Sequence, residues 1–95
     1  MVLHLVLFRF KEESKVHLDD AVASLKSMVG RVEVIRDLKA GKDFLHSRRS
    51  YDLAVSVTLD DAQALKAYDT HPDHQPVKKF LAPLLEGSIS VDFEY

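Results

Sequence analysis

The sequence predicts an α+β domain in which a four-stranded antiparallel sheet carries its helices on one face. Two observations lead to this class. Stretches with the alternating or continuous apolar character of strands are interleaved with stretches that repeat apolar residues at the three- and four-residue spacing of helices. The 95 residues are expected to form one domain, residues 1–95, with a thin core.

The first half of the chain predicts a strand, a helix and a second strand. Residues 2–10 are apolar on both alternating sets, with His4 the one polar interruption, so this strand should be covered on both faces. A helix is expected over residues 16–29, ending at Gly30, because four apolar residues recur at spacings of four, three and four: Leu18, Val22, Leu25 and Val29. A less buried strand is expected within residues 32–44.

The second half predicts a strand, a pair of helices and a final strand. Residues 51–59 alternate cleanly between apolar and polar positions. Residues 60–68 should form a helix with an acidic first turn, and Asp73 should cap the helix that follows. Gly87 should end this helix pair, and residues 88–95 alternate once more as the last strand.

This element order is the ferredoxin-like βαββαβ arrangement. Helices on one face of the sheet cover only that face, whereas the first strand is apolar on both. A monomer would therefore expose a large apolar patch on the other face. We expect a homodimer in which two such sheets pack against each other, since closed two-fold dimers are the commonest oligomers.

Composition excludes several classes of protein. The net charge is −2 and the only basic pair of the loop before residue 51, Arg48-Arg49, has no interleaved aromatic residues, so no nucleic-acid partner is expected. The absence of cysteine excludes disulfides and thiolate metal sites. No run approaches the roughly 20 apolar residues of a membrane span, and the N-terminus has no leader, so a cytoplasmic protein without a membrane partner is the default expectation.

The chemistry-bearing side chains concentrate between Tyr68 and His74, in the sequence Tyr-Asp-Thr-His-Pro-Asp-His. Pro72 cannot donate a backbone hydrogen bond and pushes His71 out of the helical region. The segment should therefore form a corner between two helices, with the His71 ring satisfying backbone groups that the break exposes. A metal site on His71 and His74 is disfavoured because the two histidines straddle this break and no HExxH pattern occurs, so no metal is expected.

Four pieces of the chain together resemble the stress-responsive dimeric α/β-barrel domain family, and the match covers nearly the whole sequence. They are the first strand from His4 to Lys11, the Tyr51-Asp52 opening of the third strand, the Tyr68-x-x-His71-Pro72-x-His74 corner and the closing Val91-Asp92-Phe93. The resemblance implies a dimeric α/β barrel. The family includes plant stress-related proteins, bacterial proteins of unassigned function and a plant polyketide cyclase that closes a ring by aldol condensation without a cofactor.

The resemblance to that cyclase implies roles for individual residues. His74 and Tyr68 match its catalytic pair, and His4 matches a histidine that lines its pocket. Leu53 stands where the cyclase has another pocket histidine, so a different substrate is expected. In the implied strand order Asp92 lies beside the first strand, where it can hydrogen-bond an imidazole and raise its basicity. The expected substrate-binding residues are therefore His4, His71, Asp92, Val6, Phe8, Leu53 and Val55.

We therefore expect a cleft that binds a small organic ligand and a cofactor-independent acid/base reaction, such as aldol cyclisation. Two other functions stay open. The corner can serve only to tie the helix break, in a non-enzymatic stress or interaction protein whose dimer is the functional unit. A cofactorless monooxygenase is the third candidate. The pairs Arg48-Arg49 and Lys78-Lys79 are interpreted as solvated surface.

Overall fold

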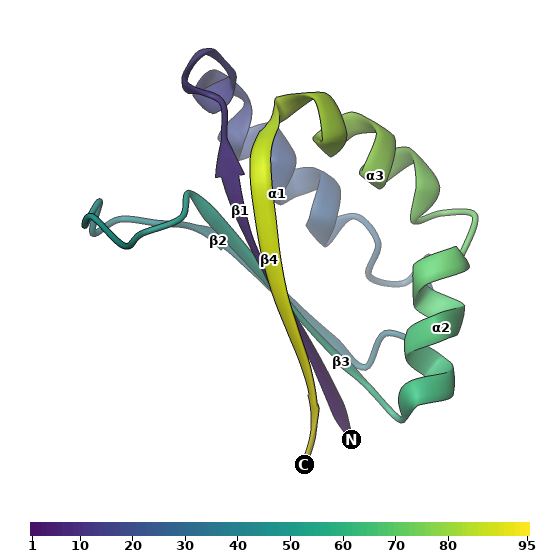
Figure 1. The fold of residues 1–95 in the computed structure, drawn as a ribbon. Coiled ribbons are helices and arrows are strands. Elements are labelled where there is room, and N and C mark those ends of the chain that lie inside the picture. The colour runs from purple at the N-terminus through teal and green to yellow at the C-terminus, as the bar shows by residue number, and fades with distance from the viewer.

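The four strands form one antiparallel sheet in the order β2-β3-β1-β4, which confirms the ferredoxin-like prediction. The computed structural model describes all 95 residues. Its strands are β1 (Val2–Phe10), β2 (Asp37–Lys42), β3 (Leu53–Leu59) and β4 (Leu85–Glu94). The helices are α1 (Leu18–Lys26), α2 (Ala62–Thr70) and α3 (Gln75–Leu81), with short 3₁₀ turns η1 (Glu12–His17) and η2 (Ala82–Leu84). All helices lie on one side of the sheet (Figure 1).

The segment between α1 and β2 differs most from the prediction. The helix begins at Leu18, after η1, and ends at Lys26, and β2 begins only at Asp37. Between them the backbone makes tight turns, with Gly30 at a φ of 86° that favours glycine. Met28 and Val32 are buried in the core from these turns. Their apolar character therefore reflects burial of a loop, which periodicity alone does not distinguish from burial of a helix or strand.

Two boundaries near the helix pair also differ from expectation. Asp61 caps α2, its carboxylate accepting the Ala64 backbone N–H at 2.8 Å. Asp73 does not cap α3, whose N-cap is His74 without a side-chain cap bond. Pro76 stands in the first turn of α3, where a missing N–H costs nothing. Gly87 does not end the helices, because it lies within β4, opposite the register shift between Arg9 and Phe10.

The core lies between the inner face of the sheet and the helices. Odd-numbered β3 residues point into it, as the alternation predicts, and β1 adds Val2, Phe8 and Phe10. Facing them are buried residues of the helix layer: Ala21, Leu25, Tyr68, Val77 and Leu81. Full burial of each large apolar side chain contributes about 1.5 to 3 kcal/mol. The core therefore fixes the position of α2 and α3 over β1 and β3.

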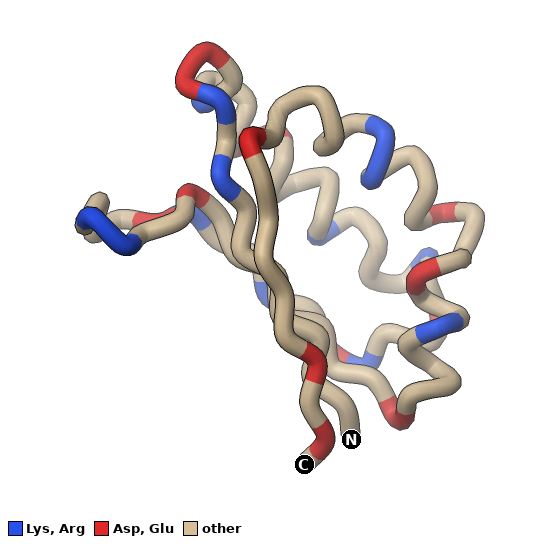
Figure 2. The backbone as a smooth tube through the Cα atoms, in the orientation of Figure 1, with Lys and Arg blue, Asp and Glu red and all other residues tan.

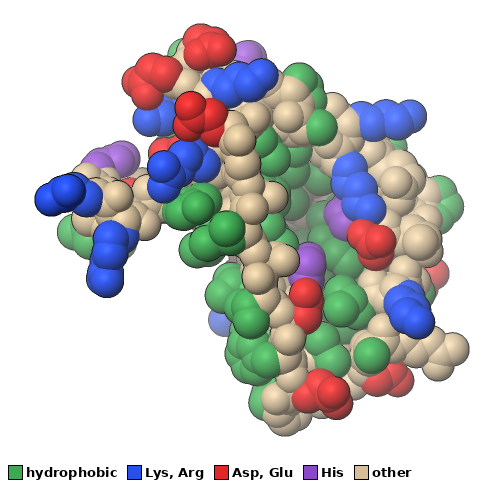
Figure 3. All heavy atoms as spheres, in the orientation of Figure 1, with side chains coloured by type: hydrophobic (Ala, Val, Ile, Leu, Met, Phe, Trp, Pro, Cys, Tyr) green, Lys and Arg blue, Asp and Glu red, His purple; other side chains and the backbone are tan.

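The outer face of the sheet carries an apolar strip along β1 and β4, whereas β3 places Ser56 and Thr58 on the same face. Leu5 pairs across the sheet with Val91, and Leu3 and Leu7 pair with Phe93 and Ile89. The three β4 residues of this set are exposed, and Figure 3 shows hydrophobic side chains gathered along the outer side of β4. Such a continuous apolar surface is typical of an interface.

Lys and Arg are spread along the chain and do not gather in one patch (Figure 2). None of the helices combines the length and apolar character that crossing a bilayer requires.

The capping difference gives a test of the helix pair. Asp61→Ala should lower the free energy of unfolding by about 1 kcal/mol, because it leaves the Ala64 N–H without its cap. Asp73→Ala removes the same carboxylate from a position with no side-chain cap bond and should change stability by less than half as much. Urea unfolding of the two variants measures the difference, and equal losses would show that Asp73 caps α3 after all.

Candidate functional site

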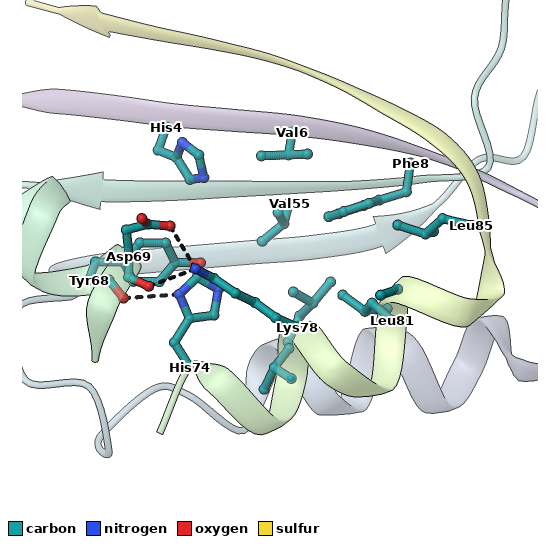
Figure 4. A pocket seen from close by; sticks show the side chains of 13 residues that line it. His4, Val6, Phe8, Val55, Tyr68, Asp69, His74, Lys78, Leu81 and Leu85 are labelled. Carbon is teal, nitrogen blue, oxygen red and sulfur yellow. Dashed lines mark hydrogen bonds and ion pairs between the residues drawn. The ribbon is translucent and has the colours of Figure 1, made fainter. Parts of the chain in front are cut away.

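A cavity of about 250 Å³ lies between the inner face of the sheet and the α2–α3 corner and opens to solvent. Figure 4 shows His4 and Val6 pointing into it from β1 and His74 and Lys78 pointing into it from α3. Its polar groups gather at the corner end, and apolar side chains line the rest. The lining residues are His4, Val6, Phe8, Leu25, Val55, Tyr68, Asp69, His74, Val77, Lys78, Leu81, Ala82 and Leu85.

The proline corner places the two central side chains. The helix α2 ends at Thr70, and His71 takes the extended conformation (φ −58°, ψ 135°) that a following proline favours. Tyr68 lies in the last turn of α2, and His74 begins α3. The chain reversal stacks their rings, with centroids 4.2 Å apart.

His74 is only 8% exposed and uses one ring nitrogen for structure. Its Nδ1–H donates to the Tyr68 backbone carbonyl at 2.9 Å. Because a neutral imidazole carries one proton, Nε2 holds a free lone pair. Burial lowers the pKa of His74, and the bond to the Tyr68 carbonyl opposes this in part. The ring is therefore neutral at pH 7 and able to accept a proton.

Tyr68 is held protonated beside it. Burial raises the pKa of the Tyr68 phenol to about 12, and the charge of Asp69 adds to the effect. Its hydroxyl makes no hydrogen bond within the chain, and no fully buried side-chain polar atom lacks a partner. The hydroxyl therefore reaches accessible space, and Tyr68 lines both the cavity and a second opening beside it. Tyr68 thus offers a free O–H donor beside the His74 ring.

His4 is paired with Asp92, its direct cross-strand neighbour on β4. The Nδ1–H of His4 donates to the Asp92 carboxylate, and the ring meets Tyr68 edge-on at a centroid distance of 5.7 Å. The imidazole that Asp92 binds is that of His4. The second opening, of similar volume, lies on the far side of His4, between β4 and α2, and contains Asp92, Lys66 and Asp69.

Three expected substrate-binding residues lie outside the cavity lining: His71, Leu53 and Asp92, the last of which lines the second opening. His71 accepts the Asp73 backbone N–H on Nδ1 at 3.0 Å and donates from Nε2 to Glu33 at 3.1 Å, so it ties the corner. Leu53 is buried in the core beside Phe8, nearer the β2–β3 loop. Val6, Phe8 and Val55 line the cavity.

The sequence interpretation missed the ion pair at the cavity rim. The Lys78 ammonium donates to the Asp69 backbone carbonyl at 2.7 Å and to its carboxylate at 2.8 Å. This interaction lowers the pKa of Asp69. Lys78 therefore belongs to the site, and only Lys79 fits the expectation of a solvated pair. The spacing rules for side-chain pairs on one helix do not apply to residues nine apart on two sides of a corner. The only feature of the sequence that pointed to this pair is the opposite charge of its two residues.

The side chains do not gather as metal ligands: no group of three or more His, Asp or Glu residues has a metal-binding arrangement. Three of the four ring nitrogens of His71 and His74 are engaged in hydrogen bonds within the chain.

Comparison with known proteins identifies the family. The Stress responsive A/B Barrel Domain matches residues 2–95. The chain belongs to this family. A curated relative, an uncharacterized protein of Streptomyces coelicolor, is 31% identical over 78 residues, which cover 79% of this chain and 80% of the relative. A stress-response A/B barrel domain-containing protein of Arabidopsis thaliana is 25% identical over 95% of this chain and 82% of its own.

Solved structures of other proteins have the same fold. A dimeric protein of unknown function with a ferredoxin-like fold from Bacteroides fragilis superposes with a TM-score of 0.89 at 27% identity, covering 99% of this chain and 95% of its own. The hydroxynitrile lyase of Passiflora edulis has the same fold, with a TM-score of 0.83 at 18% identity. The match covers 97% of this chain and 90% of the lyase. Dimeric proteins and an enzyme therefore stand among the structural neighbours of this A/B barrel domain.

The burial of His74 predicts a pH dependence of stability. In the unfolded chain His74 binds a proton at its ordinary pKa of 6.5, whereas in the folded state its pKa is lower. The contribution of neutral His74 to the free energy of unfolding is therefore complete above pH 6.5 and falls as the pH drops below that value. The lowered pKa of Asp69 acts separately, below its ordinary value of 3.8. His74→Asn, whose side-chain amide can replace the Nδ1–H donor, should lose less stability than the parent between pH 7 and pH 5.5 in urea unfolding.

Two controls belong to that measurement. His17→Asn makes the same change at an exposed position and should keep the parent's pH dependence. His74→Ala leaves the Tyr68 carbonyl without its donor and should cost about 1 to 3 kcal/mol at pH 7.5. If His74→Asn follows the parent's curve between pH 7 and pH 5.5, burial of His74 does not control this dependence.

Proposed function

We propose that this A/B barrel domain binds a small organic molecule in the cavity and that His74 and Tyr68 act on it as a cofactor-independent acid/base pair. One observation carries the proposal. A buried, neutral imidazole with a free Nε2 and a phenol hydroxyl with no partner in the chain are stacked at the polar end of one cavity. A carbonyl compound with an adjacent C–H bond suits this pair.

The chemistry follows from the two protonation states. The Nε2 of His74 takes a proton from the carbon next to the carbonyl, and the C–H electron pair moves into the carbonyl to form an enolate. The Tyr68 hydroxyl donates a hydrogen bond to the enolate oxygen, which stabilises its charge. In an aldol cyclisation the enolate carbon then attacks a second carbonyl of the same molecule, and the imidazolium returns its proton to the alkoxide.

The fold is compatible with an enzymatic role, since a hydroxynitrile lyase has the same fold. The competing class is a non-enzymatic protein in which the corner only ties two helices. In that case the Nε2 of His74 and the hydroxyl of Tyr68 should both be packed and hydrogen-bonded within the chain. The free Tyr68 hydroxyl and the open cavity favour the acid/base function, whereas the structural bonds of His71 account for the corner by themselves.

Exchange of a ketone's α-hydrogens with D₂O tests the first step without knowledge of the natural substrate. NMR should show that the parent accelerates deuteration of 2-nonanone over buffer. The His74→Asn variant should lower the protein-dependent rate about 10²- to 10⁴-fold, the usual contribution of a general base. Tyr68→Phe should also lower it, and the surface control His17→Asn should not.

A parent protein that exchanges the ketone no faster than the His74→Asn variant would contradict the acid/base proposal and support the non-enzymatic class.

We further propose that two copies pack through their outer sheet faces. One apolar set lies on this face, with its β4 members exposed and its β1 members partly exposed in the single chain: Ile89, Val91 and Phe93 on β4, and Leu3, Leu5 and Leu7 on β1. The β2–β3 loop projects away from the helix side (Figure 1) and carries Phe44, which is 88% exposed and borders a groove with Leu7 and Ala54. The dimeric structural neighbours with this fold support a dimer.

Val91→Asp tests this interface against a matched control. Val91 is 51% exposed in the single chain, so an aspartate there harms a monomer little, but in a dimer it would bury an unpaired charge. Val16→Asp makes the same change at an 81% exposed position on η1. Light scattering should show a dimer for the parent and Val16→Asp and a monomer for Val91→Asp. A dimeric Val91→Asp of parental stability would rule out this face.

A further inference from the structure

The charge arrangement at the polar end of the cavity selects among carbonyl compounds. Lys78 is the only lysine or arginine that lines the cavity, and Asp69 is its only carboxylate. The two form an ion pair, with the Lys78 ammonium held by both the carboxylate and the backbone carbonyl of Asp69. The cavity therefore contains a cation and an anion that already satisfy each other.

The neighbouring charges reinforce this neutrality. Asp92, which lines the second opening, holds the Nδ1–H of His4, so His4 adds no unpaired cation to the cavity. Lys66 lies in the second opening on the far side of His4, and that opening also contains Asp69 and Asp92. A ligand carboxylate in the cavity would thus lose its hydration without gaining an unpaired cation, and two carboxylates would lie nearby.

The two other polar groups of the cavity, the Tyr68 hydroxyl and the His74 Nε2, suit an uncharged ligand. The Tyr68 hydroxyl can donate to a carbonyl oxygen, and the neutral Nε2 of His74 can only accept. Beyond them the cavity wall is apolar, from Val6 and Val55 to Leu81 and Leu85. Figure 4 shows the Lys78 ammonium turned toward Asp69, which leaves this wall uncharged.

We infer that the site accepts uncharged carbonyl compounds with an apolar chain or ring and rejects the corresponding carboxylates, and that Asp69 determines this choice by neutralising Lys78. The inference rests on the proposed function, because it names the substrate class of that same cavity. Asp69 is a specificity-determining residue in this account. It does not take part in the proton transfer.

The experiment compares 2-nonanone with octanoate, which have the same number of non-hydrogen atoms and differ in charge. Amide chemical shifts followed by NMR titration locate each probe and give its affinity. The parent should bind the ketone about tenfold more tightly than octanoate, and Asp69→Asn should raise the affinity for octanoate about tenfold or more by freeing the Lys78 charge. Affinity for the ketone should stay within about twofold in that variant.

Two further variants isolate the cause. Asp20→Asn makes the same change in net charge at an exposed position of α1 and should leave both affinities as in the parent. The double variant Asp69→Asn with Lys78→Gln should lose the gain in octanoate affinity. The Asp69→Asn variant is expected to fold. Asp69 lies in the last turn of α2, where a negative charge is unfavourable beside the negative end of the helix dipole, so its removal does not weaken the helix.

The outcomes separate this inference from the proposed function. If the parent binds octanoate as tightly as the ketone, or if Asp69→Asn does not raise octanoate affinity, the role of Asp69 is wrong while ketone binding and exchange still support the acid/base site. If neither probe shifts the cavity amides of parent or variant, both the substrate class and the small-molecule cavity are overturned.

Discussion

The hydrogen bond from the His74 Nδ1–H to the Tyr68 carbonyl is the constraint on which the site depends. It closes the chain reversal that Pro72 begins, so it fixes α2 relative to α3 and the Tyr68 ring against the imidazole. The same bond determines which nitrogen of His74 is protonated. A structural contact on one side of the ring therefore leaves the lone pair of the other nitrogen for chemistry, and the two functions of this histidine do not compete.

Burial and pairing divide the titratable groups of the site between two roles. His74 and Tyr68 are buried without charge partners of their own, so burial lowers the pKa of one, raises the pKa of the other, and keeps both neutral near pH 7. The charged groups around them are paired instead, Asp69 with Lys78 and His4 with Asp92. A small domain can hold this many polar groups near its core because each of the paired ones is satisfied inside the chain.

The two faces of the sheet then have different tasks. The inner face and the helices form the core and the cavity, and the outer face carries an apolar strip along β1 and β4 that no element covers in a single chain. The first strand contributes to both, because its alternate side chains point to opposite faces. The site and the proposed dimer contact are therefore coupled through the placement of one central strand, which pairs with both β3 and β4.

The sequence by itself determined the features that local chemistry dictates. Pro72 forces the corner wherever the helices lie, the two-residue period of β3 decides which of its residues face inward, and the apolar character of both alternating sets of β1 places apolar side chains on both faces of the sheet. Only the tertiary structure decided that Asp92 holds His4, that Asp69 and Lys78 pair across the corner, that His71 and Leu53 lie outside the cavity, and that Met28 and Val32 reach the core from turns. These contacts join side chains on separate elements, so they depend on how the helices rest on the sheet, which short-range preferences along the chain do not specify.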